Sequence, residues 1–273
     1  MIHFRGLVVA LAVVLSAVAC TGDKGITAPL RRATPSLETT VIASAHGQST
    51  ANDVLLLQAI SLQLDRTSAP GARRALVSLD ITYGGVDCTY NIMSLRFVCP
   101  AVAMDSMTIS AEYALYDALG ASQMTYNDIT TASAQVWYKA FGNLVNPTGA
   151  ADIDRVRTLT VNGLSGTESQ RTFGGSGTDQ ASGTITGSPG KTYVLSDTTI
   201  APNVVYGIPL ALNVWPRSGT LTTKSQLNVT ELGVTTTTNK SVVITFNGTR
   251  LVNMDVGSTG FTLDLATGGV VAR

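Results

Sequence analysis

The chain has 273 residues, of which 13% are charged, and its 18 basic side chains balance its 18 acidic ones. A neutral chain with so few charges lacks the clustered Lys and Arg residues that bind nucleic acid or an anionic membrane surface. Its length suits one large β-type domain or two small ones, and it can bury a core without help from a metal.

Residues 1–19 have the pattern of a secretory signal peptide. One positive charge at Arg5 precedes an unbroken apolar run from Leu7 to Val14, and small residues follow that run. The apolar stretch is too short for a comfortable transmembrane span. We therefore expect the chain to be exported and residues 1–19 to be removed.

The residues Ala17-Val18-Ala19-Cys20 resemble the lipobox of bacterial lipoproteins. The resemblance implies that Cys20 becomes the first residue, carries lipid and anchors the protein to a membrane. Because Thr21, and not Asp, follows the cysteine, the resemblance also implies the outer membrane and not the inner one. The motif departs from the commonest pattern by having Ala17 three places before the cysteine. The alternative is an exported protein that is cut after Ala19 and keeps a free thiol.

The chain has three cysteines, and an exported protein tends to pair its thiols, so one cysteine is left over. Lipidation of Cys20 would account for the odd one. The other two cysteines, Cys88 and Cys99, flank a short apolar segment, and a hairpin there would place them opposite each other. Their spacing fits neither a C-x-x-C redox site nor a zinc knuckle. We therefore predict a structural disulfide, which would stabilise the fold by about 2–3 kcal/mol.

Two segments are expected before the β-rich part. Residues 20–49 hold the lipidated Cys20 and a Gly-, Pro- and Ser-containing stretch without sustained periodicity, which predicts a flexible tether. Residues 51–66 predict a helix with an apolar stripe at Val54, Leu57, Ile60 and Leu64, broadened by Leu55 and Leu56. Thr50 and Asp53 approximate a capping box. The helix has no basic polar face, so we expect it to dock on a sheet and not to lie on a membrane.

From residue 73 onward, apolar and polar residues alternate, which is typical of antiparallel strands with one wet face. Threonine, with 37 copies against four glutamates, favours strands over helices. Alternating segments at 75–83, 107–115, 221–230, 242–246 and 261–265, with turn signals at Gly84-Gly85, Asn162-Gly163, Gly174-Gly175, Asn247-Gly248 and Gly268-Gly269, indicate about a dozen strands. We predict an all-β, mainly antiparallel domain over 50–273: an open curved sheet, or a flattened barrel or sandwich, with the N-terminal helix packed on it. An internal break is possible near 142–151.

The positions of the two histidines bear on catalysis. His3 lies in the signal peptide and His46 in the expected tether, so we expect no imidazole in the folded domain. This argues against Ser-His-Asp catalysis and against most zinc or copper sites, and we expect no metal, cofactor or catalytic residue. Asp152 and Asp154 form a D-x-D pair that is more typical of a solvated turn than of a calcium site. The glycine-rich stretch 173–177 lacks the Lys and the following helix of a phosphate loop, which favours a hairpin turn.

Three functions remain open. The first is a lipid-anchored cell-envelope protein with a non-catalytic structural or binding role, whose partner could be another envelope protein. The second is a carrier of a lipid or other apolar ligand, loosely similar to the half-barrel lipoprotein carriers, and the third is a hydrolase that uses paired carboxylates. Weak ligand-binding candidates are Leu56, Leu57, Ile60, Leu64, Trp137 and Trp215. Trp137, Phe141 and Trp215 could line a sugar or lipid platform, although aromatic side chains in strands favour the core.

Overall fold

The computed structural model describes residues 34–67, 88–104, 106–146, 149–185, 188, 190–208, 212 and 214–273. Residues 35–273 form one compact unit. The predicted signal peptide with Cys20, the predicted strand at 75–83 and the glycine pair at 84–85 lie outside the described residues.

The described residues form one helix and fourteen strands. The helix is α1 (Leu37–Thr67). The first seven strands are β1 (Thr89–Asn91), β2 (Arg96–Val98), β3 (Val102–Met104), β4 (Met107–Asp117), β5 (Ser122–Gln123), β6 (Thr131–Asn146) and β7 (Gly149–Asn162). The others are β8 (Gln170–Thr184), β9 (Lys191–Gly207), β10 (Thr220–Glu231), β11 (Val234–Thr245), β12 (Leu251–Val256), β13 (Thr259–Asp264) and β14 (Val270–Ala272).

All fourteen strands belong to one antiparallel sheet. Its order is β1-β2-β4-β6-β7-β8-β9-β10-β11-β12-β13-β14, and β3 and β5 pair with β4 beside this path. The sheet stays open and does not close into a barrel, which confirms the predicted all-β class with one N-terminal helix. Sequence neighbours from β6 to β14 are also neighbours in the sheet, so the architecture is a series of hairpins.

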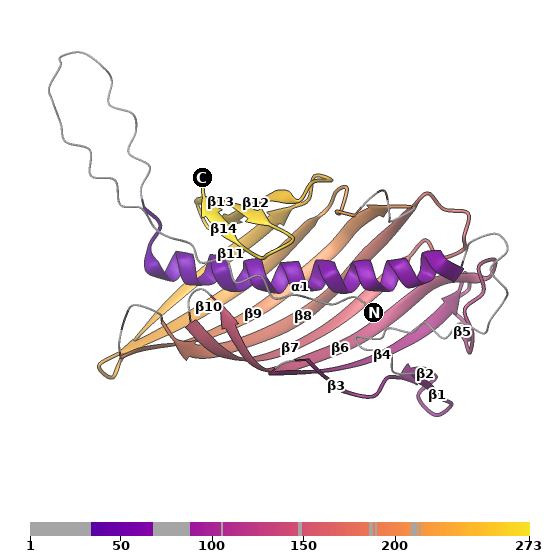
Figure 1. Ribbon diagram of the computed structural model, residues 1–273, viewed down its shortest axis with the longest axis horizontal. Helices are drawn as coiled ribbons and strands as arrows, with labels where there is room; N and C mark the ends of the chain where they lie inside the picture. Colours follow the sequence, from indigo (N-terminus) through magenta and orange to yellow (C-terminus); the bar gives the residue numbers. More distant parts are fainter. Residues whose placement is uncertain are drawn as a thin grey trace, which may run out of the picture. The chain divides into compact units, whose positions relative to one another are not determined.

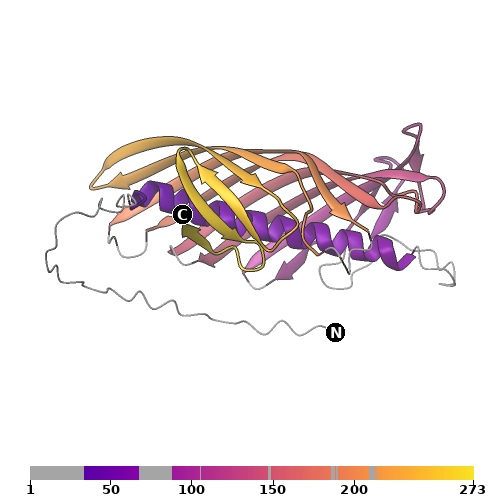
Figure 2. The same ribbon diagram turned by 90° about the horizontal axis from the view of Figure 1, so that it is seen from above.

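The helix α1 lies across one face of the sheet and crosses the strands obliquely (Figures 1 and 2). It begins after Ser36, whose hydroxyl accepts a hydrogen bond from the Thr39 N–H at 3.2 Å, the arrangement of an N-cap. The predicted helix start at residue 51 and the predicted cap at Thr50 and Asp53 are therefore wrong, because both side chains are buried in mid-helix. The predicted tether up to residue 49 overlaps the first half of this helix.

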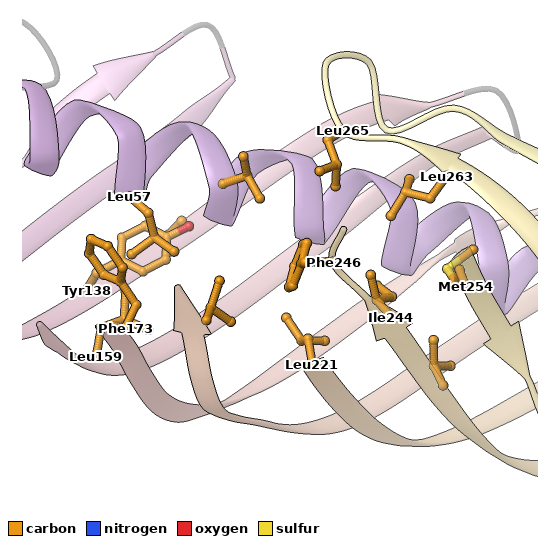
Figure 3. Close-up of a cluster of buried hydrophobic side chains, with 14 of the residues drawn as sticks. Leu57, Tyr138, Leu159, Phe173, Leu221, Ile244, Phe246, Met254, Leu263 and Leu265 are labelled. Carbon is orange, nitrogen blue, oxygen red and sulfur yellow. The ribbon is translucent and has the colours of Figure 1, made fainter. Parts of the chain in front are cut away.

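The apolar core lies between α1 and the facing side of the sheet. Val54 and Leu57 are buried there as predicted, whereas Leu55 is 40% exposed. Burial of one such side chain stabilises the fold by about 1.5–3 kcal/mol. Figure 3 shows Leu57 in a cluster of buried hydrophobic side chains with residues from the sheet, the C-terminal strands and their loops: Tyr138, Leu159, Phe173, Leu221, Ile244, Phe246, Met254, Leu263 and Leu265.

One sequence-based expectation about a turn is corrected. The glycine-rich stretch 173–177 lies inside β8 and not in a hairpin turn. Gly175 adjoins a register shift between β8 and β9, and Gly177 leaves room for the Arg157 side chain, so glycine here permits a close approach within a strand. Within the stretch 142–151, the end of β6 pairs with the start of β7, up to Asn146 opposite Gly149, so the two strands form a hairpin inside the compact unit.

Candidate functional site

A row of four polar residues crosses the helix-facing side of the sheet. Arg155 of β7 stands opposite Asp179 of β8, which stands opposite Asp197 of β9, which stands opposite Ser225 of β10. Residues that pair directly across antiparallel strands point to the same face, and all four are buried. We call these four residues the buried polar row.

The helix carries a polar stripe that faces this row. His46, Ser49 and Asp53 are three and four residues apart, a spacing that places them on one side of a helix, and all three are buried. Apolar residues at the same spacing, Ile42 and Leu57, lie before and after the stripe and are also buried. The contact between helix and sheet is therefore polar in its middle and apolar on either side.

The carboxylate of Asp179 is the centre of the network. It accepts hydrogen bonds from Arg155 Nε at 3.0 Å, from Arg157 Nη1 and Nη2 at 2.8 and 2.7 Å, and from Ser49 Oγ at 3.2 Å. Burial by itself would raise the pKa of the Asp179 carboxyl, but the charges of Arg155 and Arg157 outweigh burial and hold that pKa at about 2. Asp179 is therefore fixed as a buried anion.

Arg157 links the sheet to the helix. Its Nε donates to Asp53 Oδ2 at 3.1 Å, and its Nη2 donates to Ser49 Oγ at 3.1 Å. Burial lowers the pKa of Arg155 and of Arg157, but the carboxylates of Asp53 and Asp179 reverse that effect and raise both values above the ordinary one. Removing one partner from such a buried network leaves a buried charge without a partner, which costs about 3–5 kcal/mol.

His46 belongs to the same interface, so the expectation of a domain without imidazole is wrong. Its side chain is 2% exposed, and its Nε2 lies 2.7 Å from Ser225 Oγ and 3.4 Å from Asp197 Oδ1. A catalytic triad places the serine and the carboxylate on opposite ring nitrogens, with the serine open to substrate. Here one nitrogen meets both partners beneath the helix, which is the geometry of a structural contact.

The sequence carried one signal for this interface that apolar periodicity misses. Ile42, His46, Ser49, Asp53 and Leu57 continue a single helical stripe, but its three middle members are polar. Periodicity in hydrophobicity detects the ends of such a stripe and not its middle. Only the facing charges on β7, β8 and β9 explain why these polar residues are buried.

A groove of about 930 Å³ lies on the other face of the sheet, away from the helix. Two neighbouring rows of side chains cross β6 to β11 along it, each defined by direct cross-strand pairing. The first row is Lys139, Val156, Thr178, Thr198, Lys224 and Ser241, and the second is Phe141, Asp154, Gln180, Ser196, Gln226 and Asn239. We call the surface formed by these two rows the outer groove.

The ligand-binding candidates named from the sequence do not form one site. Leu57 is buried in the helix–sheet core, while the side chains of Leu56, Ile60 and Leu64 lie outside the described residues. Trp215 packs against the core from the connection before β10, as expected of an aromatic residue. Trp137 is not part of that core: it lies on the outer face of β6, with the Arg96 guanidinium 3.6 Å from its ring centroid.

The described part of the helix–sheet interface contains little free space. The apolar cavity beside Val54 and Leu57 measures about 30 Å³, whereas a carrier needs room for a whole ligand. The cavity beside Ser49 and Asp197 is equally small. A space of this size corresponds to about one water molecule.

The predicted disulfide and the D-x-D pair both lie within the described residues. A disulfide joins Cys88 and Cys99 at the base of the β1–β2 hairpin, as predicted. Asp152 and Asp154 lie on the exposed face of β7, in a strand instead of a turn, and contact Asn143 and Lys139.

Two features are absent from the described residues. Within residues 34–67 and 88–273, apart from the undescribed positions, three or more His, Cys, Asp or Glu side chains nowhere gather as a metal site would require. The same part of the chain contains no helix that is both long and apolar enough to cross a bilayer.

The described residues, with their two polar surfaces, define an open antiparallel β-sheet protein in which helix α1 is held by buried ion pairs. Neither a protein-family model, nor a curated protein, nor a solved structure matches the chain.

Proposed function

We propose that this protein is a lipid-anchored component of the bacterial cell envelope with a non-catalytic structural or binding role. The apolar run followed by Ala17-Val18-Ala19-Cys20 supports export and lipidation of Cys20. Because Cys88 and Cys99 pair with each other, Cys20 is the odd cysteine, and lipidation gives it a use. Thr21 after the cysteine favours the outer membrane, by analogy with other lipoproteins.

The non-catalytic part of the proposal depends on the burial and the bonding partners of His46, Asp179 and Asp197. His46, Asp179 and Asp197 are of residue types that often perform acid–base chemistry, and these three side chains are buried at the helix–sheet interface. Asp179 is occupied by two arginines, and His46 by Ser225. A general acid or base must reach its substrate, and these groups are covered by α1.

The two alternative functions receive less support. A carrier of an apolar ligand requires a large cavity between helix and sheet, and the described part of that interface holds only about 30 Å³ beside Leu57. A hydrolase with paired carboxylates requires two acids facing each other across a cleft. Of the described residues that line the outer groove, Asp154 is the one carboxylate with an exposed side chain, and it contacts Lys139.

The proposal is tested by expressing the full chain in a bacterium that processes lipoproteins. We expect the wild-type protein in the membrane fraction, with intact-mass spectrometry placing diacylglycerol and acyl chains on an N-terminal Cys20. Cys20→Ala should move the protein to the soluble fraction, whereas Ser16→Ala, which keeps the cysteine, should leave it in the membrane. An unacylated wild-type protein that begins elsewhere would refute the anchor.

A further inference from the structure

We propose that the outer groove binds a linear, largely uncharged polysaccharide chain. This inference names a ligand class for the binding role proposed above, and it depends on the groove and not on the lipid anchor. The groove crosses six neighbouring strands, so with strands about 4.8 Å apart it is about 24 Å long. A surface of this length suits an extended chain better than a small metabolite.

The groove offers the hydrogen-bonding groups that sugars require. Most of its outward side chains are neutral hydroxyls and amides, including Thr178, Gln180, Thr198, Gln226 and Asn239. Each hydroxyl donates and accepts, and each amide presents both a carbonyl oxygen and two N–H donors. Sugar hydroxyls have the same double character, so a chain of them can pair along both rows.

The charges of the groove agree with a neutral or weakly acidic ligand. Lys139 and Asp154 lie 3.3 Å apart and compensate each other, and Lys224 adds one exposed positive charge in the first row. Nucleic acid would require many more cations. An apolar ligand or the core of a protein interface would require an apolar surface, and Val156 is the only aliphatic side chain among the described residues of the two rows.

An aromatic ring closes one end of the second row. Phe141 of β6 stands opposite Asp154, and 45% of its surface is exposed. Lys139 Nζ lies 5.7 Å from the centroid of the Phe141 ring, and the exposed part of that aromatic face can stack on the apolar face of a sugar ring. The ring complements the apolar face of a pyranose, and the polar rows complement its hydroxyl groups.

The floor of the groove is held rigid by the buried polar row. Asp179 lies between Thr178 and Gln180 in the chain and points to the opposite face, and Asp197 lies between Ser196 and Thr198 in the same way. The ion pairs and hydrogen bonds of this row therefore fix the strands directly behind the groove. A rigid surface loses less entropy on binding, which favours a shallow site that makes many weak contacts.

The test uses the detergent-extracted full chain with two soluble probes, a β-linked N-acetylglucosamine pentasaccharide and cellopentaose. Binding is measured by calorimetry and by chemical-shift perturbation of side-chain amides. We expect at least one probe to bind and the double variant Gln180→Ala/Gln226→Ala to bind at least tenfold more weakly, which equals about 1.4 kcal/mol. Phe141→Ala should weaken binding as well.

The matched control is Gln135→Ala/Gln170→Ala, the same chemical change on the same face but outside the groove. This control should bind as the wild type does, and circular dichroism should show every variant folded. The proposal is overturned if neither probe binds, or if the groove variant and the control bind equally. Neither result bears on acylation of Cys20, so the ligand and the anchor are tested separately.

Discussion

Gly177 of β8 lies directly opposite Arg157 of β7, and the Arg157 side chain occupies the space where a Cβ of residue 177 would lie. Such a Cβ would lie closest to the Val156 carbonyl oxygen of β7, and it would stand 2.5 Å from Arg157 Cδ and 2.7 Å from its Nη1. The missing side chain therefore lets the guanidinium cross β8 and reach Asp179, two residues along the same strand. The glycine belongs to the ion-pair network although it carries no charge.

Gly177→Ala should consequently destabilise the protein. We expect the free energy of unfolding to fall by about 1–3 kcal/mol, because the added methyl group clashes with the Val156 carbonyl oxygen and displaces Arg157 from its two hydrogen bonds to Asp179. Urea denaturation followed by tryptophan fluorescence measures this loss. Ser176→Ala, one residue away on the exposed face, should change stability by less than about 0.5 kcal/mol. Equal effects at the two positions would contradict the role assigned to Gly177.

Asp179→Ala should be one of the most damaging single substitutions in the chain. It leaves Arg155 and Arg157 buried without their shared carboxylate, and we expect a loss of about 3–5 kcal/mol in denaturant unfolding. Asp154→Ala is the matched control, because Asp154 lies on the same sheet and pairs with a cation in solvent. That change should cost no more than about 1 kcal/mol. A small effect at Asp179 would mean that water reaches the network.

Acid should weaken the protein through the same carboxylate. The pKa of Asp179 is about 2 in the folded protein, below its ordinary value of 3.8, so the unfolded chain takes up the proton first as the pH falls. This contribution is present in full above about pH 4 and is lost as the pH falls through 2; it amounts to about 2 kcal/mol. The stability difference between wild type and Asp179→Asn should therefore shrink by that amount between pH 5 and pH 2. A constant difference across this range would be evidence against the assigned pKa.

The contact between His46 and Ser225 can be measured by a double-mutant cycle. Their side chains lie 2.7 Å apart and are buried, so we expect His46→Ala and Ser225→Ala to couple by about 1 kcal/mol. His46→Gln, whose amide can also reach the hydroxyl, should retain part of that energy. Additive effects of the two alanine substitutions would show that the hydrogen bond contributes nothing to stability.

The sequence alone determined the class of the fold and several local features. Alternation along 107–115 and 221–230 predicted β4 and β10. In β10 one face packs on the core while the other is more exposed, whereas β4 has no fully exposed residue. The spacing of Cys88 and Cys99 predicted their disulfide, because a short hairpin brings its ends together. Both inferences use periodicity or proximity along the chain, which a sequence contains.

The tertiary structure decided what the polar residues do. His46 and Ser49 suggested a solvated tether, Asp53 suggested a helix cap, and Gly177 suggested a turn, because polar and glycine residues usually lie in such places. The burial of the three helix residues depends on Arg157, Asp179 and Asp197, which lie about a hundred residues or more away from them in the chain. Charges compensate one another in space and leave no periodic trace along the chain. The local N-cap at Ser36 precedes the helix start at Leu37, whereas the buried polar row and the outer groove arise only where the strands lie side by side.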